Sequence, residues 1–168
     1  MTKLYTTSVR QIGILVRDFD ESVAAFEKFL NHPCDYRGVT EPYEVTGQQL
    51  RGKPCTGRCQ QALFNLENIQ IELISPCGEG DSVWRESLEK DGEGLHHIAF
   101  KTNNIQGAMA SVSARSNAEL MQYGTWPDDP APGQYAYLDA RGKLSTIVEL
   151  MESPEGEPWD RLQEYTPA

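Results

Sequence analysis

Residues 10–14 read Arg-Gln-Ile-Gly-Ile, and residues 96–100, which lie 86 positions further along the chain, read His-His-Ile-Ala-Phe. The correspondence continues at the same spacing, where residues 18–26 match residues 104–112. In both copies an apolar strand is followed by a polar turn and an amphipathic helix. Similar segments at a fixed spacing are the signature of an internal repeat, so we interpret the chain as two related halves.

A second pair of segments marks the end of each half. Residues 71–76 read Ile-Glu-Leu-Ile-Ser-Pro, and residues 148–154 read Val-Glu-Leu-Met-Glu-Ser-Pro, 77 positions later. The smaller offset of this pair indicates shorter loops in the second half. Each half is therefore predicted to run from a strand through a helix to further strands, the last of which carries a central Glu.

The expected elements follow from this pattern. The first half is predicted to contain a helix at 20–31, with Asp20 as its N-cap, and strands at 9–17, 36–46, 59–66 and 68–75. The second half is predicted to contain a helix at 105–115 and strands at 95–102, 118–124, 133–140 and 145–152. With 168 residues we expect one domain over 1–168. It divides into module one at about 8–76, a linker helix at about 81–91, module two at about 94–152 and a tail at 153–168.

Four predicted strands each carry one polar residue on the face opposite their apolar neighbours, because side chains alternate across a strand. These residues are Gln11, Glu72, His97 and Glu149. The face could simply be wet, since antiparallel sheets commonly have a solvated side. However, an amide, an imidazole and two carboxylates at equivalent places can also bind a divalent ion, and Gly13 and Ala99 leave space beside it. Such ligands suit Zn, Ni, Co, Mn or Fe(II) alike.

Together with the repeat, residues 92–100 (Gly-Glu-Gly-Leu-His-His-Ile-Ala-Phe) and the Glu-Leu pairs at 72–73 and 149–150 resemble the vicinal oxygen chelate superfamily over residues 8–152. Residues 71–100 most resemble methylmalonyl-CoA epimerases, whereas the Gln/Glu/His/Glu set resembles animal-type glyoxalase I. The resemblance implies an α+β fold in which paired βαβββ modules form a cup-shaped, mostly antiparallel curved sheet. It also implies one divalent metal ion in the cup, held by Gln11, Glu72, His97 and Glu149.

His96, next to His97 in the sequence, is expected to have a different role. His97 aligns with Gln11 in the repeat, so we prefer it as the ligand and expect His96 to point toward the helix layer in a structural role. The sequence departs from the epimerases at Gln11, where they usually have His, and at residues 139–143, where they have a His-Pro-Lys segment.

The resemblance implies a metal-dependent isomerase or epimerase that acts on an acyl-CoA through a metal-stabilised enolate, with Glu149 and Glu72 as candidate catalytic bases. Arg51, Lys53 or Arg58 would then lie near the nucleotide phosphates, although these residues could equally belong to a solvated loop. Two alternatives stay open. One is a glyoxalase-I-type lactoylglutathione lyase acting on a glutathione adduct, and the other is a non-enzymatic small-molecule-binding protein of the same fold. The resemblance also implies a homodimer.

Charge and composition exclude several partners. The formal net charge of −10 argues against nucleic acid as a partner, because a protein that binds the phosphate backbone needs a positively charged surface. The longest apolar stretch, residues 12–16, is far shorter than the roughly 20 residues of a membrane span, so we expect no membrane partner. Residues 1–5 lack the features of an export signal, which favours the cytoplasm. The cysteines at 34, 55, 59 and 77 lack paired CxxC spacing, so we interpret them as free thiols.

Overall fold

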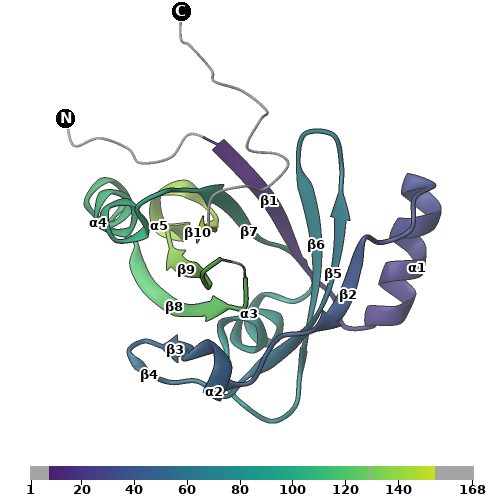
Figure 1. Cartoon of the computed structure of the whole chain (residues 1–168), viewed down its shortest axis with the longest axis horizontal. Helices are drawn as coiled ribbons and strands as arrows, with labels where there is room; N and C mark the ends of the chain where they lie inside the picture. Colours follow the sequence, from purple (N-terminus) through teal and green to yellow (C-terminus); the bar gives the residue numbers. More distant parts are fainter. Residues whose placement is uncertain (1–7, 129, 154–168) are drawn as a thin grey trace, which may run out of the picture.

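The computed structural model describes residues 8–128 and 130–153. Ten strands in this part of the chain form one sheet that curls into a half-barrel (Figure 1), in the order β2-β5-β6-β1-β7-β10-β9-β8-β3-β4. Two of the strand pairings are parallel, β1 with β6 and β7 with β10, and the others are antiparallel. The predicted α+β fold with a cup-shaped, mostly antiparallel sheet is therefore confirmed.

The first half of the chain supplies one side of the half-barrel. Its main elements are β1 (Ser8–Leu15), α1 (Phe19–Leu30), β2 (Tyr36–Val39), β5 (Arg58–Asn65) and β6 (Gln70–Cys77). The excursion between β2 and β5 contains α2 (Tyr43–Thr46), β3 (Gln49–Leu50) and β4 (Lys53–Pro54). This short hairpin crosses to the opposite edge of the sheet, where β3 pairs with β8.

The second half is built in the same way. Its elements are β7 (Gly94–Lys101), α4 (Ile105–Ser116), β8 (Glu119–Trp126), β9 (Gly133–Asp139), α5 (Arg141–Leu144) and β10 (Ile147–Glu152). The connecting helix α3 (Val83–Asp91) begins after its N-cap Ser82 and ends at Gly92, close to the predicted bounds. The first strands of the two halves, β1 and β7, pair at the centre of the sheet. The expected tail lies outside the described residues from position 154 onward.

Two local predictions are wrong. The strand predicted at 36–46 ends at Val39, because Pro42 begins the single turn of α2 and Gly47, at φ 54°, ends it. The N-cap of α1 is Asp18 rather than Asp20. Its carboxylate accepts the backbone N–H of Glu21 at 3.0 Å, while Asp20 lies in the first turn.

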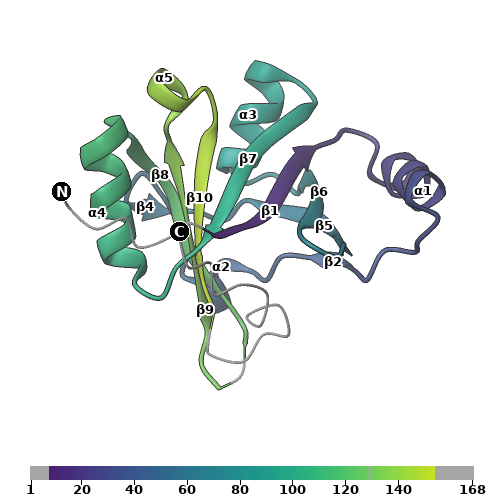
Figure 2. The same cartoon turned by 90° about the horizontal axis from the view of Figure 1, so that it is seen from above.

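Helices α1 and α4 lie at opposite ends of the sheet on its outer face (Figure 2). Under α1, Leu73 and Phe64 pack with Val23, and under α4, Leu138 and Leu150 pack with Ile105. The inner face also holds a core of buried side chains, which comprises Leu15, Cys59, Ile74, Val83, Trp84, Met121, Tyr135, Tyr137 and Ile147. Both faces of the curled sheet are thus buried over much of their area. None of the helices in the described residues is long and apolar enough to span a membrane.

Candidate active site

The four polar residues singled out in the sequence converge on the inner face of the sheet. They come from four adjacent strands in the order β6, β1, β7 and β10. The Nε2 atom of His97 lies 3.0 Å from Oε2 of Glu149, 3.2 Å from Oε1 of Gln11 and 3.6 Å from Oε2 of Glu72. We call Gln11, Glu72, His97 and Glu149 the tetrad.

The register of the central strands explains this convergence. Gly13 of β1 lies opposite both Glu72 of β6 and His97 of β7. An added Cβ on Gly13 would lie 2.0 Å from Cε1 of His97, so the glycine provides the space that the imidazole ring occupies. We expected Gly13 to leave room for an ion, whereas in the structure it makes room for the imidazole of the tetrad.

The tetrad is removed from solvent. The exposed fractions of these residues are 3% for Gln11, Glu72 and Glu149 and 0% for His97, so the interpretation of a wet sheet face is wrong at this position. Burial raises the pKa of Glu72 to about 7, and the nearby charge of Glu149 adds to the rise while His97 opposes it. Burial lowers the pKa of His97, but the carboxylates of Glu149 and Glu72 outweigh burial and raise it overall.

His96 occupies a different place from the one predicted. A register shift between Gly13 and Ile14 leaves His96 as an extra residue of β7, opposite no partner on β1. Its Nδ1 lies 3.0 Å from Nδ1 of His97, and its ring packs edge-on against Tyr137. The prediction that His96 points toward the helix layer is therefore wrong, because the bulge brings both histidines to the inner side. Burial, followed by the charge of His97, holds the pKa of His96 well below its usual value.

Two tetrad residues, Glu72 and Gln11, are hydrogen-bonded to the side-chain amides of neighbouring glutamines. The Nε2 group of Gln61 donates to Oε1 of Glu72 at 2.6 Å. The Nε2 group of Gln11 donates to Oε1 of Gln70, again at 2.6 Å. In this orientation the amide oxygen of Gln11 faces the other three tetrad residues, at 3.2 Å from Nε2 of His97. The reversed amide would instead donate to Nε2 of His97 and to Oε2 of Glu72 and Glu149, so the metal-free tetrad favours the N–H group. A cation between the four residues would favour the oxygen.

The spacing of the tetrad suits a metal ion. Ligand atoms bonded at about 2.1 Å lie about 3.0 Å apart at right angles and about 3.4 Å apart in a tetrahedron. The separations from His97 Nε2 to the other three atoms, 3.0 to 3.6 Å, cover this range. Still, no group of three or more His, Cys, Asp or Glu side chains within 8–128 and 130–153 stands as a ready-made metal site. The amide of Gln11 would have to complete the ligand set, and the donor types fit a divalent ion.

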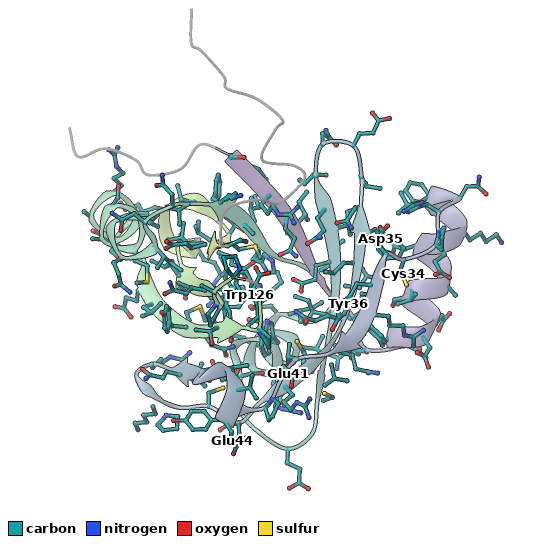
Figure 3. All side chains as sticks on the ribbon, viewed as in Figure 1. Cys34, Asp35, Tyr36, Glu41, Glu44 and Trp126 are labelled. Atoms are coloured by element: carbon teal, nitrogen blue, oxygen red, sulfur yellow. The ribbon has the colours of Figure 1, made fainter. Side chains whose placement is uncertain are left out.

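A cavity of about 510 Å³ opens above the tetrad, and Gln11, Glu72 and Glu149 line its floor. Its walls are rich in aromatic side chains, which are Tyr36, Trp84, Trp126, Tyr135 and Tyr137. Tyr36, from β2, and Trp126, from the end of β8, lie on either side of the cavity (Figure 3). The volume is that of a pocket for a small organic molecule.

Two charged residues that line the cavity were missed in the sequence analysis. Glu41 lies in the loop between β2 and α2, a segment that was predicted as strand. Arg10 is an extra residue of β1, since the pairing with β7 shifts between Val9 and Gln11. Strict alternation cannot place a bulge residue, but the position of Arg10 directly before the repeated Gln could have drawn attention to it.

The basic residues that we expected near nucleotide phosphates do not line the cavity. Arg51 forms a two-pronged ion pair with Glu86, with N–O distances of 2.9 and 2.7 Å. The Nε group of Arg58 donates to the carbonyl oxygen of Thr40 at 2.7 Å. Lys53 lies in the exposed hairpin of β3 and β4.

The four cysteines are free, as predicted. Cys59 is buried in the inner core, and burial raises the pKa of its thiol well above the usual value. The Sγ atom of Cys55 contacts the backbone oxygen of Asp81 at 3.0 Å.

Comparison with known proteins identifies proteins that are similar to this chain in sequence or in fold. A curated relative, the uncharacterized protein YqjC of Bacillus subtilis (strain 168), is 34% identical over 97 residues. The match covers 57% of this chain and 66% of YqjC, which is just under two thirds of that protein.

Solved structures share the fold at low identity. The hypothetical protein BH1468 of Bacillus halodurans C-125 has a TM-score of 0.63 and 20% identity, and the match covers 89% of this chain and 96% of that one. Methylmalonyl-CoA epimerase of Mycobacterium tuberculosis has a TM-score of 0.63 at 18% identity, covering 92% and 93%. An epimerase of Streptomyces coelicolor, in complex with 2-nitronate-propionyl-CoA, has a TM-score of 0.62 at 21% identity, covering 90% and 98%.

The family assignment rests on the sequence itself. Residues 10–138 match the glyoxalase/bleomycin resistance protein/dioxygenase superfamily, and this range contains three of the four tetrad residues. The matched range, together with the half-barrel fold, shows that the chain belongs to this superfamily.

Proposed function

We propose that this chain is a metal-dependent epimerase or isomerase that moves a proton at a carbon next to a carbonyl group, with an acyl-CoA as its substrate. The observation that carries the proposal is the convergence of the tetrad, within 3.0 to 3.6 Å of His97 Nε2, on the floor of a cavity of about 510 Å³. The epimerases of similar fold support the substrate class, since their structures hold 2-nitronate-propionyl-CoA or methylmalonyl-CoA.

The tetrad would bind one divalent ion through Gln11 Oε1, His97 Nε2 and one oxygen each of Glu72 and Glu149. When bound, such an ion withdraws electron density from substrate oxygens and makes the neighbouring C–H bond more acidic. Ligation through Nε2 requires the His97 proton to lie on Nδ1. There His96 Nδ1, at 3.0 Å, can accept it and fix the ring orientation.

The remaining wall residues would hold the substrate and exclude water. Tyr137 of β9 is paired with Glu149 of β10, and its ring centre lies 5.2 Å from that of His97. Burial, followed by the charges of Glu149 and Glu72, raises the pKa of Tyr137 well above its usual value. Its hydroxyl therefore stays protonated and can donate to a substrate oxygen.

Proton transfer needs a carboxylate that is free to act as a base. Glu149 and Glu72 are candidates, but a carboxylate held by an ion is a weak base and would have to detach during turnover. Epimerisation also needs a proton donor on the opposite face of the carbon. Glu41 is a further carboxylate that lines the cavity, and it comes from the loop after β2 rather than from the floor. We therefore propose Glu41 as the second acid–base group.

The experiment measures deuterium incorporation at the α-carbon of methylmalonyl-CoA in D₂O, with the purified chain loaded with Co²⁺, Zn²⁺ or Mn²⁺. Metal-dependent exchange supports the proposal. The E41Q variant should still bind metal and exchange the proton on one face while losing inversion. Glu44 provides a matched control, because it lies nearby in α2 (Figure 3) but does not line the cavity, and E44Q should behave as wild type.

Other outcomes would identify the alternatives. Formation of a thioester from methylglyoxal and glutathione, without exchange at the acyl-CoA, would indicate a lactoylglutathione lyase. Absence of bound metal and of both reactions would contradict the assignment as an enzyme and would favour a non-enzymatic small-molecule-binding protein. The homodimer and the cytoplasmic location stay predictions, and sedimentation of the purified chain would test the first.

A further inference from the structure

Three side-chain amides form a hydrogen-bonded row beside the tetrad. Gln11 Nε2 donates to Gln70 Oε1 at 2.6 Å, and Gln70 Nε2 donates to Asn65 Oδ1, also at 2.6 Å. The three residues face one another across adjacent strands, since Gln70 of β6 is paired with Gln11 of β1 on one side and with Asn65 of β5 on the other. Gln11 and Gln70 are only 3% and 4% exposed.

The row can run in either of two directions. In one of them each amide directs its N–H group toward the next oxygen, and the oxygen of Gln11 is left on the side of the tetrad. There it lies 3.2 Å from His97 Nε2, 3.3 Å from Glu72 Oε2 and 3.2 Å from Glu149 Oε2. Without an ion, the tetrad atoms act as acceptors and favour the opposite direction, in which the N–H group of Gln11 faces them. A cation between them favours the oxygen.

Gln11 cannot reverse its amide alone. Reversal would turn its N–H group toward the tetrad acceptors, but it would also place its oxygen against Gln70 Oε1 at 2.6 Å. Two acceptor oxygens at that distance repel each other, so Gln70 and then Asn65 would have to reverse as well. The orientation of the tetrad amide is therefore coupled to that of Asn65, two strands away.

We propose that Gln70 and Asn65 are positioning residues that hold the oxygen of Gln11 toward the metal ion. The inference rests on the proposed function, because it requires an ion at the tetrad. The reversed row would present an NH₂ group to the ion, and such a group cannot act as a ligand. Partners that orient a ligand in this way usually change metal affinity by about 10-fold to 100-fold when they are removed.

The test compares Zn²⁺ affinities, measured by competition with a chromophoric chelator, for the full-length chain and its variants. N65D retains the acceptor for Gln70 and should bind Zn²⁺ at least as tightly as wild type. N65A removes the acceptor and should bind at least about tenfold more weakly. Ser153 lines the same cavity outside the amide row, so S153D measures the effect of adding a charge alone. The melting temperature of each metal-free variant shows whether the fold is retained.

The outcomes separate this inference from the proposed function. If wild type binds no ion, the proposed metal site is wrong and the row has no ligand to orient. This result would contradict both the proposed function and the positioning role. If wild type binds Zn²⁺ and N65A binds it equally well, or if N65D is weakened as much as N65A, only the positioning role is overturned. Should N65A fail to fold, Q70E provides a second test. The carboxylate that Q70E introduces could only accept hydrogen bonds and would impose the same Gln11 orientation, so binding weaker than wild type would also overturn the inference.

Discussion

Replacing Gly13 with alanine perturbs the proposed metal centre through a single added methyl group. Gly13 lies in β1 directly opposite His97. The new Cβ would lie 2.0 Å from Cε1 of the His97 ring, 2.4 Å from Nδ1 and 2.5 Å from Nε2.

The size of the effect follows from these distances. Non-bonded carbon atoms approach to about 3.5 Å, so the ring must move by about 1.5 Å to accept the methyl group. Metal–ligand bonds tolerate only about 0.2 Å, so Nε2 would leave the ligand set. Since removing a residue that merely orients a ligand costs about 10-fold to 100-fold, we expect displacement of the ligand to weaken Zn²⁺ binding by at least about 100-fold. Overpacking should also lower the free energy of unfolding by about 1–3 kcal/mol.

Chelator competition would measure the affinity, and urea unfolding would measure the stability. Gly142 provides the matched control, because a Cβ there would meet nothing within 4 Å, and G142A should bind Zn²⁺ as wild type does. Wild-type affinity in a folded G13A variant would refute both the position of His97 and its assignment as a ligand.

Three further predictions concern the surroundings of the site. His96→Leu removes the acceptor at 3.0 Å from the neighbouring imidazole and should weaken Zn²⁺ binding about tenfold in a chelator titration, so unchanged affinity would exclude an orienting role. Asp35 accepts the backbone N–H of Asn65, and this bond lowers the pKa of its carboxyl group, although burial opposes the shift. The stabilisation that the ionised Asp35 provides is present above the unfolded-state pKa and is lost as pH falls through the lower pKa of the folded state. Asp35→Asn should therefore lower the urea midpoint at pH 7 by the equivalent of under about 1 kcal/mol and have little effect at pH 3. Arg51→Met breaks an exposed ion pair with Glu86 and should cost under about 1 kcal/mol without changing the KM for acyl-CoA, whereas a raised KM would restore a phosphate-binding role.

The sequence allowed prediction of the features that depend on long-range repetition. Strand β1 and its counterpart β7 were located because the same pattern recurs 86 residues later, and the terminal strands of each half because each carries a central Glu. The tetrad was identified for the same reason, since each of its residues occupies an equivalent strand in the repeat. That these residues come together is a property of the pairing between β1 and β7.

Other features depend on tertiary contacts that periodicity does not encode. By alternation Leu15 shares the face of β1 that carries Gln11, yet it is only 2% exposed, because the curled sheet and Trp84 of α3 create a second core on the inner face. The bulges at Arg10 and His96 change the face of the sheet to which single side chains point, and no particular residue type in the sequence predicts a bulge at these positions. The four-residue helix α2 and the two-residue strands β3 and β4 are too short for a periodic signal.

The seam between β1 and β7 divides the four tetrad residues equally, with Gln11 and Glu72 on one side and His97 and Glu149 on the other. An ion bound by the tetrad would cross-link the two halves of the polypeptide. Metal loading would then make them unfold as one cooperative unit, and a chain cut between β6 and β7 would regain its ion only when both fragments reassociate.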